Sequence, residues 1–319
     1  MAGGALIRDL REEDAAAVAA LRIAVNPHQV VTPRGVWYRA AHTIERERRR
    51  DWVAELDGEI VGCARAGFEW SVPTPGKGFF WVGVHSDLRG RGIGGRLYDA
   101  ATGYLIAQGA FRLRTWVDED PAGEAFVRRR GFGPGRADRV SELDPREVDV
   151  SELSRLEERG FDLAPLTRAR DRLHDLYEIC AAGERDMPGE EPETELDLES
   201  WKRDELDLPD LSQEGSFVAL AGGRPVSLAF LTIDPERRIA YNQMTATLPE
   251  YRRRGLALLV KLAAAQWAAE NGIERLLTEN DTENAAMLAL NARLGYRPLY
   301  EQRSWTLSLE RERPPGQCG

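Results

Sequence analysis

The chain carries the same arrangement of expected elements twice, and this internal repeat constrains its fold more than any single motif. In each half a short strand and a helix come first, and two strand-like runs follow around a glycine turn. A further strand then enters an Arg/Gly-rich turn and a long helix. Each half closes with a strand, a helix, a Gly-aromatic pair (Gly131-Phe132 and Gly295-Tyr296) and a last strand. Two tandem copies of one α/β domain are therefore expected.

The length of 319 residues suits two domains of ordinary size, each able to bury its own core. A charged stretch with little periodicity lies between the two copies, and such stretches are typical of linkers. We predict an N-terminal domain over residues 1–145, a linker over 146–160 and a C-terminal domain over 161–319.

The two Arg/Gly-rich turns are suited to holding a phosphate. A strand that enters such a turn and then a helix presents backbone N–H groups and the positive end of the helix dipole. Glycine lets an anion approach the backbone, and arginine adds cationic forks. Neither turn has the GxxxxGK[ST] spacing of a nucleoside-triphosphate loop or the acidic residue of a dinucleotide fold. The turn residues are Arg89, Gly90, Arg91, Gly92, Ile93, Gly94 and Gly95 in the first half, and Arg252, Arg253, Arg254, Gly255, Leu256 and Ala257 in the second.

Strand and turn together resemble the acetyl-CoA signature of the GNAT N-acetyltransferase superfamily, in which R/Q-x-x-G-x-G/A follows the fourth strand. The first half carries it as Val82-x-Val84-x4-Arg89-Gly90-x-Gly92-Ile93-Gly94. The second half carries it as Thr245-x-Thr247-x4-Arg252-x-x-Gly255-Leu256-Ala257, with alanine at the last position. Asn284 of the second half matches the place where an asparagine of the family contacts the pantetheine arm.

This resemblance implies an α/β (α+β) fold of two tandem GNAT-type domains, each a mixed sheet flanked by helices. The fourth and fifth strands of each sheet would splay apart. Acetyl-CoA would enter that gap, at up to one molecule per domain. The backbones of Val82, Val84, Thr245 and Thr247 would contact pantetheine, and the Arg/Gly turns would hold the pyrophosphate.

Both halves depart from the family at the tyrosine that protonates the departing thiolate in many members. Val127 stands there in the first half and Asn291 in the second. Asp120 replaces the pantetheine asparagine in the first half, whereas Asn284 keeps it in the second. The C-terminal half is therefore favoured as the catalytic one. The phosphate turn of the first half matches the family signature more closely than that of the second. The first half is therefore either a second active site or a cofactor-binding copy.

Members of the family usually place the catalytic base on the third or fourth strand near the splay. By position the candidates are Asp234 in the second half and Glu69 in the first, and each could instead be a solvated carboxylate at a strand end. Tyr241, at the start of the second half's fourth strand, could line the acceptor site or only pack against its neighbours.

The expected function is acetyl transfer from acetyl-CoA to a primary amine in a direct ternary complex. The acceptor would be a small-molecule amine or a peptide N-terminus. A non-catalytic protein that binds or senses acetyl-CoA, and an acyltransferase that uses a longer acyl-CoA, are the alternatives. The absence of the tyrosine from both halves favours the non-catalytic protein.

Composition narrows the partners and the compartment. A net charge of −10 argues against nucleic acid, and no apolar run approaches the roughly 20 residues that cross a bilayer. Cys63, Cys180 and Cys318 lie too far apart for a zinc motif or a disulfide framework, so we expect no metal and a reducing, cytoplasmic location. A monomer and a homodimer are both compatible with the sequence.

Overall fold

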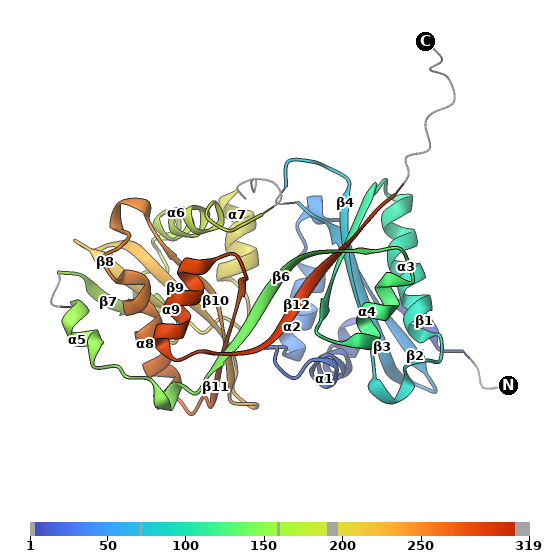
Figure 1. The fold of residues 1–319 in the computed structure, drawn as a ribbon, viewed down its shortest axis with the longest axis horizontal. Coiled ribbons are helices and arrows are strands. Elements are labelled where there is room, and N and C mark those ends of the chain that lie inside the picture. Colours follow the sequence, from blue (N-terminus) through green and yellow to red (C-terminus); the bar gives the residue numbers. More distant parts are fainter. Residues whose placement is uncertain (1–3, 71, 158–159, 190–196, 310–319) are drawn as a thin grey trace, which may run out of the picture. The chain divides into compact units, whose positions relative to one another are not determined.

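The computed structural model describes residues 4–70, 72–157, 160–189 and 197–309, which form two compact units (Figure 1). The first unit contains the described parts of Met1–Val25, Thr43–Arg136 and Arg303–Gly319. The second contains those of Asn26–His42 and Ala137–Gln302. The units therefore divide the chain differently from the sequence repeat, whose boundaries stay a prediction.

The first unit is a mixed sheet with helices on both faces. Its strand order is β1-β2-β3-β4-β5-β12-β6, where β12 and β6 enter with only the parts that belong to this unit. The strands are β1 (Leu6–Asp9), β2 (Arg50–Leu56), β3 (Glu59–Phe68), β4 (Lys77–Val84), β5 (Arg112–Asp118), β6 (Gly133–Leu143) and β12 (Arg297–Ser308), and the helices are α1 (Ala15–Val25), α3 (Ile93–Ala107) and α4 (Pro121–Arg128).

The second unit repeats this plan, with strand order β12-β6-β11-β10-β9-β8-β7. Its own strands are β7 (Asp162–Pro165), β8 (Phe217–Ala221), β9 (Arg224–Asp234), β10 (Ile239–Thr247) and β11 (Arg275–Asp281). Its helices are α2 (Pro33–Ala41), α5 (Glu152–Glu157), α6 (Leu173–Glu184), α7 (Leu198–Trp201), α8 (Leu256–Glu270) and α9 (Ala285–Leu294).

Short helical turns connect these elements. Six are 3₁₀ turns: η1 (Glu12–Asp14), η2 (Glu45–Glu47), η3 (Ser86–Leu88), η4 (Pro145–Glu147), η5 (Leu166–Arg168) and η7 (Pro249–Tyr251). One is a π-helical turn, η6 (Lys202–Leu206), which continues directly from α7.

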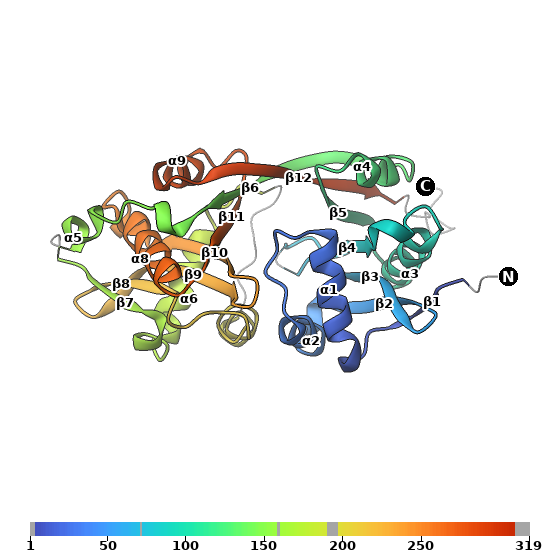
Figure 2. The same cartoon turned by 90° about the horizontal axis from the view of Figure 1, so that it is seen from below.

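In the first unit the alternation of β3 directs neighbouring residues to opposite helices. A side chain at Gly62 would collide with Leu97 of α3. Cys63, by contrast, lies close enough to Arg22 of α1 for the arginine's charge to affect the pKa of the thiol. Because successive residues of a strand point to opposite faces, α1 and α3 cover opposite faces of this sheet (Figure 2). Small residues on β3 let both helices approach closely.

In the second unit α8 is the centre of the core. It is apolar on nearly every side, and ten of its residues are buried. It packs on β8, β9 and β10, and α5 and η4 cover it from outside. On the other face, Gly183 of α6 lies against Ala246 of β10, so closely that a methyl group there would collide.

The last strand of each sequence half continues into the unit built mainly from the other half. β6 ends in the second unit, where Ala137–Leu143 belongs and where Leu143 pairs with Leu276 of β11. β12 ends in the first unit, where it lies beside β5 and where Trp305 is fully buried in the core. Each half therefore supplies a strand that the other unit needs.

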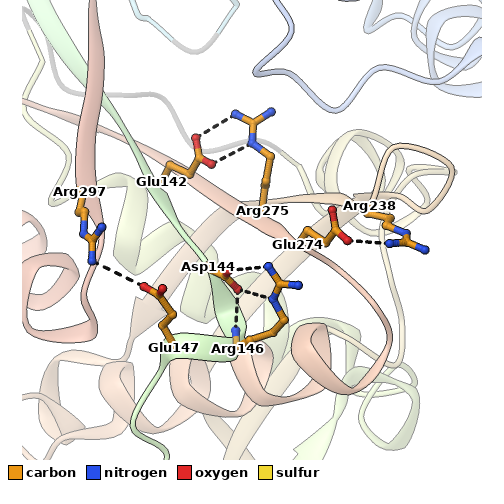
Figure 3. Close-up of polar contacts among 8 residues, drawn as sticks. All are labelled: Glu142, Asp144, Arg146, Glu147, Arg238, Glu274, Arg275 and Arg297. Carbon is orange, nitrogen blue, oxygen red and sulfur yellow. Dashed lines mark hydrogen bonds and ion pairs between the residues drawn. The ribbon is translucent and has the colours of Figure 1, made fainter.

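An ion pair joins β6 of the first half to β11 in the second unit (Figure 3). Arg275 of β11 donates from Nε and Nη2 to the carboxylate of Glu142 on β6, at 2.8 and 2.9 Å. The same Nη2 lies 2.6 Å from Nδ1 of His28 in the segment Asn26–His42. The pairs nearby are Arg238 with Glu274, Arg146 with Asp144, and Arg297 with Glu147.

Both sheets open where the fourth strand of each half leaves the fifth. In the first unit, parallel pairing covers only Lys77–Phe79 with Arg112–Arg114. In the second it covers only Ile239–Asn242 with Arg275–Thr278. All four strands continue beyond the paired region, so the predicted splay is confirmed in both units.

The strand exchange predicts that Trp305→Ala destabilises the first unit, although Trp305 belongs to the second half of the sequence. Removing a fully buried indole should lower the free energy of unfolding by about 3–5 kcal/mol. Leu299→Ala, an exposed position on the same strand, should change it by less than about 0.5 kcal/mol. Hydrogen exchange of α3 and α8 amides measures which unit loosens, and faster exchange confined to α8 would contradict the strand order.

Candidate functional site

The two Arg/Gly turns have the same backbone geometry. Gly92 and Gly255 take φ of 83° and 84° and stand immediately before α3 and α8. Two residues earlier, Gly90 and Arg253 take φ of 78° and 61°. Neither helix has a side-chain cap, so the N–H groups of its first turn are free to bind an anion. The geometry thus fits a pyrophosphate in each half.

The first arginine of each turn maintains the turn itself. Arg89 Nε donates to the carbonyl of Val84 at 3.3 Å, and Arg252 Nε donates to that of Thr247 at 3.1 Å. Both contacts join residues five positions apart at the end of the fourth strand. Arg91 and Arg253 are exposed, so they are the side chains that extend most freely toward a phosphate.

The outer guanidinium nitrogens of these arginines meet different partners. Arg89 pairs with Asp120 at 3.3 Å, and Asp120 caps α4 by accepting from Ala122 N–H. Arg252 pairs with Asp186, which follows α6, at 2.6 Å. In the first unit the ion pair therefore joins the phosphate turn to the helix that follows the fifth strand.

Only the second unit has a bulge in its fourth strand. β10 shifts register against β9 between Asn242 and Met244, so Gln243 has no partner residue on β9. Its pairing with β11 has ended one residue earlier. Gln243 therefore belongs to neither ladder, at the place where β10 and β11 separate. In the first unit β4 pairs with β3 from Phe68 to Gly62 without a shift.

A carboxylate with an altered pKa lies beside this bulge. Glu205 Oε2 accepts a hydrogen bond from Nε2 of Gln243 at 2.8 Å. Burial raises the pKa of Glu205 to about 7, with nearby Glu184 and Asp204 adding to the rise and Arg39 opposing it. A carboxyl group with that pKa exchanges protons near neutral pH, as a general base must.

A segment of the first half packs against the turn that carries Glu205. Tyr38 of α2 donates its hydroxyl to the Arg203 carbonyl at 3.1 Å, and Thr32, the N-cap of α2, donates to Asp210 at 2.5 Å. Asp210 follows η6 by four residues. The environment of Glu205 in the second unit thus includes side chains from both sequence halves.

Family comparison agrees with this geometry. The model of the acetyltransferase (GNAT) family matches residues 10–132 and again residues 173–296, which together are most of the chain. The chain belongs to the GNAT acetyltransferase family. Its two matched regions make it a tandem GNAT protein, as the repeat predicted.

Individual relatives of this GNAT protein are distant. A tandem GNAT protein from the clavulanic acid biosynthesis pathway superposes with a TM-score of 0.70 at 19% identity, covering 97% of this chain and all of that one. A GCN5-related N-acetyltransferase from Sphaerobacter thermophilus gives 0.63 at 15% identity, covering 95% of each. At these identities the likeness concerns the fold alone.

A curated relative, Acetyltransferase ECA0875 of Pectobacterium atrosepticum, is 35% identical over 88 residues. The match covers 26% of this chain and 60% of that protein. The relative therefore supports the family and says little about the acceptor of this GNAT protein.

The three predicted catalytic candidates occupy different environments. Asp234 is buried at the end of β9, opposite the first residue of β10, and it pairs with Arg237 at 3.6 Å. Glu69 lies 2.7 Å from Arg114 in the first unit. The structure brings neither carboxylate to the bulge, and their catalytic roles stay predictions.

Tyr241 is enclosed beside the start of the splay. Its hydroxyl donates to Glu279 of β11 at 3.2 Å, and burial raises its pKa well above the usual value. The hydroxyl therefore stays protonated at neutral pH. It packs with Val30, Val140 and Leu277, so its environment is that of a core residue.

The predicted pantetheine residue Asn284 is the N-cap of α9, where its side chain accepts from Met287 N–H at 3.2 Å. Asn291, at the place of the family's tyrosine, is buried and donates to Asn280 of β11 at 2.6 Å. Its own Oδ1 is enclosed without a hydrogen-bond partner, which leaves an acceptor near the splay. Val127 in the first unit is a core residue.

Glu205 escaped prediction because the sequence around it reads as an acidic, solvated helix. The available signal is the spacing of Trp201 and Leu206, both fully buried and five residues apart. That spacing fits a π-turn with i→i+5 geometry, and such turns are frequent at functional sites. The turn aims Glu205 at Gln243 rather than at solvent.

No cluster of three or more His, Cys, Asp or Glu in the described residues could hold a metal ion. Among the same residues, no helix combines the length and apolarity that a membrane span requires.

Lys261 lies beneath the bulge on α8 and is only 3% exposed. Burial lowers its pKa to about 7, far below that of the unfolded chain. A folded-state pKa below the unfolded one makes the native state gain stability as pH rises between those values.

Lys261→Met should therefore raise the free energy of unfolding by about 2–4 kcal/mol at pH 7, with the gain shrinking toward pH 10. Urea unfolding across this range measures it. Lys202→Met, which removes a partly exposed partner of Asp207, serves as the control and should show no pH-dependent gain. A destabilised Lys261→Met protein would contradict this reading of the buried amine.

Proposed function

We propose that the protein is an acetyl-CoA-dependent N-acetyltransferase whose C-terminal half does the chemistry. The observation that carries this proposal is the bulge at Gln243, in the splay and beside the Glu205 carboxylate. The second unit combines a freed backbone segment, a free helix N-terminus and a carboxyl group that titrates near neutral pH. Acyl transfer to an amine requires these three elements.

Residues of the second unit fit acetyl-CoA along one path. The first-turn N–H groups of α8, with Arg253 and Arg254, would hold the pyrophosphate. The backbone of Thr245–Thr247, which β11 leaves open, would pair with the pantetheine arm. Acetyl-CoA supplies an activated acyl group as its thioester.

Glu205 would act as the general base. Its carboxylate takes one proton from the acceptor ammonium, and the freed amine attacks the thioester carbon. The C–N bond forms, the C–S bond breaks, and the second proton of the nitrogen passes to the departing sulfur. The Gln243 backbone N–H would face the carbonyl oxygen as negative charge develops there. The proton on Glu205 then leaves to solvent.

The charges around Glu205 support a cationic acceptor. Glu184 and Asp204 act on the same carboxyl group, whereas Asp207 is already paired with Arg170 and Lys202. The first two carboxylates would attract an ammonium group. A small-molecule primary amine and a peptide N-terminus both present this group.

A direct ternary complex is favoured over an acyl-cysteine. Cys63 and Cys180 are both buried, and burial raises the pKa of Cys63 to about 12 and that of Cys180 well above its usual value. Thiols of this kind are poor nucleophiles. Cys318 lies outside the described residues. A cytoplasmic monomer or homodimer remains our expectation.

The first unit is proposed to be a structural copy that keeps the phosphate turn without the chemistry. Its fourth strand has no bulge in the described pairing, and the Arg89–Asp120 ion pair joins the two sides of its splay. A non-catalytic acetyl-CoA-binding protein and an acyltransferase with a longer donor are the competing functions. Turnover with an amine panel and several acyl-CoA donors separates all three.

Glu205→Gln should lower kcat/KM for the best amine of such a panel by about 10²–10⁴-fold, because the amide cannot accept the proton. Wild-type kcat/KM should rise with pH through about 7, and the variant should lose this limb. Release of free thiol from acetyl-CoA is the measurement. Asp234→Asn is the matched control, since it tests the other carboxylate of the same unit; a larger loss there would transfer the role of base to Asp234.

A second pair of variants tests which phosphate turn serves turnover. Ala257→Glu and Gly94→Glu place a carboxylate at the same position of α8 and α3, where a side chain at Gly94 meets only ordinary contacts. An acidic residue in the first helical turn is tolerated by the helix but repels pyrophosphate. Turnover should fall at least about tenfold more in Ala257→Glu than in Gly94→Glu, with acetyl-CoA binding followed by calorimetry. The reverse order would assign the chemistry to the first half.

A further inference from the structure

The buried amine of Lys261 is joined to the bulge by one side chain. Lys261 Nζ donates a short hydrogen bond to Oδ1 of Asn242, the last residue of β10 that pairs with β11. The ring of Tyr296 lies 5.1 Å from the same nitrogen. Burial is the cause of its lowered pKa.

Asn242 replaces the hydrogen bonds that the bulge removes from the ladder. Its Nδ2 donates to the carbonyls of Phe230 on β9, at 3.0 Å, and Met244 on β10, at 3.1 Å. Its Oδ1 also accepts from Thr245 Oγ1 at 2.9 Å. The amide thus connects both sides of Gln243 to the neighbouring strand, with Lys261 beneath it.

The bulge also determines which way the neighbouring side chains point. Asn242 and Thr245 face α8, whereas Gln243 bonds to Glu205 and Met244 lies near Gly183 of α6. A regular strand would send Met244 to the α8 face, with Asn242. The extra residue therefore places Lys261 on one side of the strand and the proposed base on the other.

The first half offers an internal comparison. Aligning the two turns sets Phe79 opposite Asn242 and Tyr98 opposite Lys261. Tyr98 belongs to an aromatic cluster with Phe80, Phe126 and Phe132, and β4 has no register shift there. The half without the bulge also lacks the amide and the amine.

We propose that Lys261 is a positioning residue for acyl transfer: through its hydrogen bond to Asn242 it holds the β10 bulge, whose backbone would face the thioester oxygen. This inference rests on the function proposed above. A buried cation that only filled space would be replaced by a hydrophobic residue without penalty. If the amine also holds the bulge, its replacement lowers turnover even where the fold is kept.

The test follows the carbonyl group of bound acetyl-CoA directly. Acetyl-CoA labelled with ¹³C at the thioester carbon is bound to wild type, Lys261→Met and Lys261→Gln, and the infrared carbonyl stretch is compared with that in solution. Wild type should lower the stretching frequency, and Lys261→Met should restore most of the solution value. Lys261→Gln, which can still donate to Asn242, should show an intermediate shift if the hydrogen bond holds the bulge.

Kinetics and binding complete the test. Lys261→Met should bind acetyl-CoA within about threefold of wild type yet lose about 10–100-fold in kcat, with the KM for the amine little changed. An unchanged carbonyl stretch in both variants would overturn the inference and leave the proposed function intact. If unmodified protein fails to bind acetyl-CoA in calorimetry, the proposed function falls and this inference with it.

Discussion

Parallel pairing between β10 and β11 stops at Asn242 and Thr278, and the site in the second unit depends on that stop. A sheet normally satisfies its own backbone groups, so an interior fourth strand has nothing to offer a ligand. Here β10 loses its partner on one side and takes up an extra residue, Gln243, on the other. Backbone that would be internal becomes available, and the Arg/Gly turn that follows the same strand leads into helix α8.

The two halves separate architecture from chemistry. Both keep the left-handed glycine before the helix, the arginine that bonds to the end of the strand, and the splay. These shared features form the frame, that is, the part of the fold that both units have in common. The differences concern polar groups near the fourth strand: the amide of Asn242, the amine of Lys261 and the carboxylate of Glu205 have no counterparts among the described contacts of the first unit. The two copies thus share a frame and differ in the polar side chains beside the fourth strand.

Local patterns made the family, the tandem repeat and the splayed fold predictable from sequence. The turns are short, and glycine is required at Gly92 and Gly255 by positive φ, so their residues carry the information themselves. The exchange of β6 and β12 was not predictable, because the alternation of a strand is the same whichever sheet receives it. Trp305 looks like any core residue of its own half.

The surroundings of the bulge were harder to predict for two reasons. A bulge alters alternation by one residue, and Asn242-Gln243-Met244 gives no sequence sign of it. Glu205 comes into position through a π-turn, which the acidic stretch around it conceals. Asp234 was the visible strand-end carboxylate, whereas the carboxylate beside the bulge comes from the π-helical turn η6. That turn also has tertiary contacts, here with α2, that no local pattern encodes.

The exchanged strands also affect how the chain folds as it leaves the ribosome. The first unit cannot close its sheet until Arg303–Ser308 has been synthesised, which is after every residue of the second unit. The second unit, by contrast, already has β6 available when its own strands emerge. Vectorial synthesis therefore completes the C-terminal unit first and leaves the N-terminal core waiting for its final strand. During that interval the edge of β5 is open, and unpaired strand edges of this kind favour aggregation.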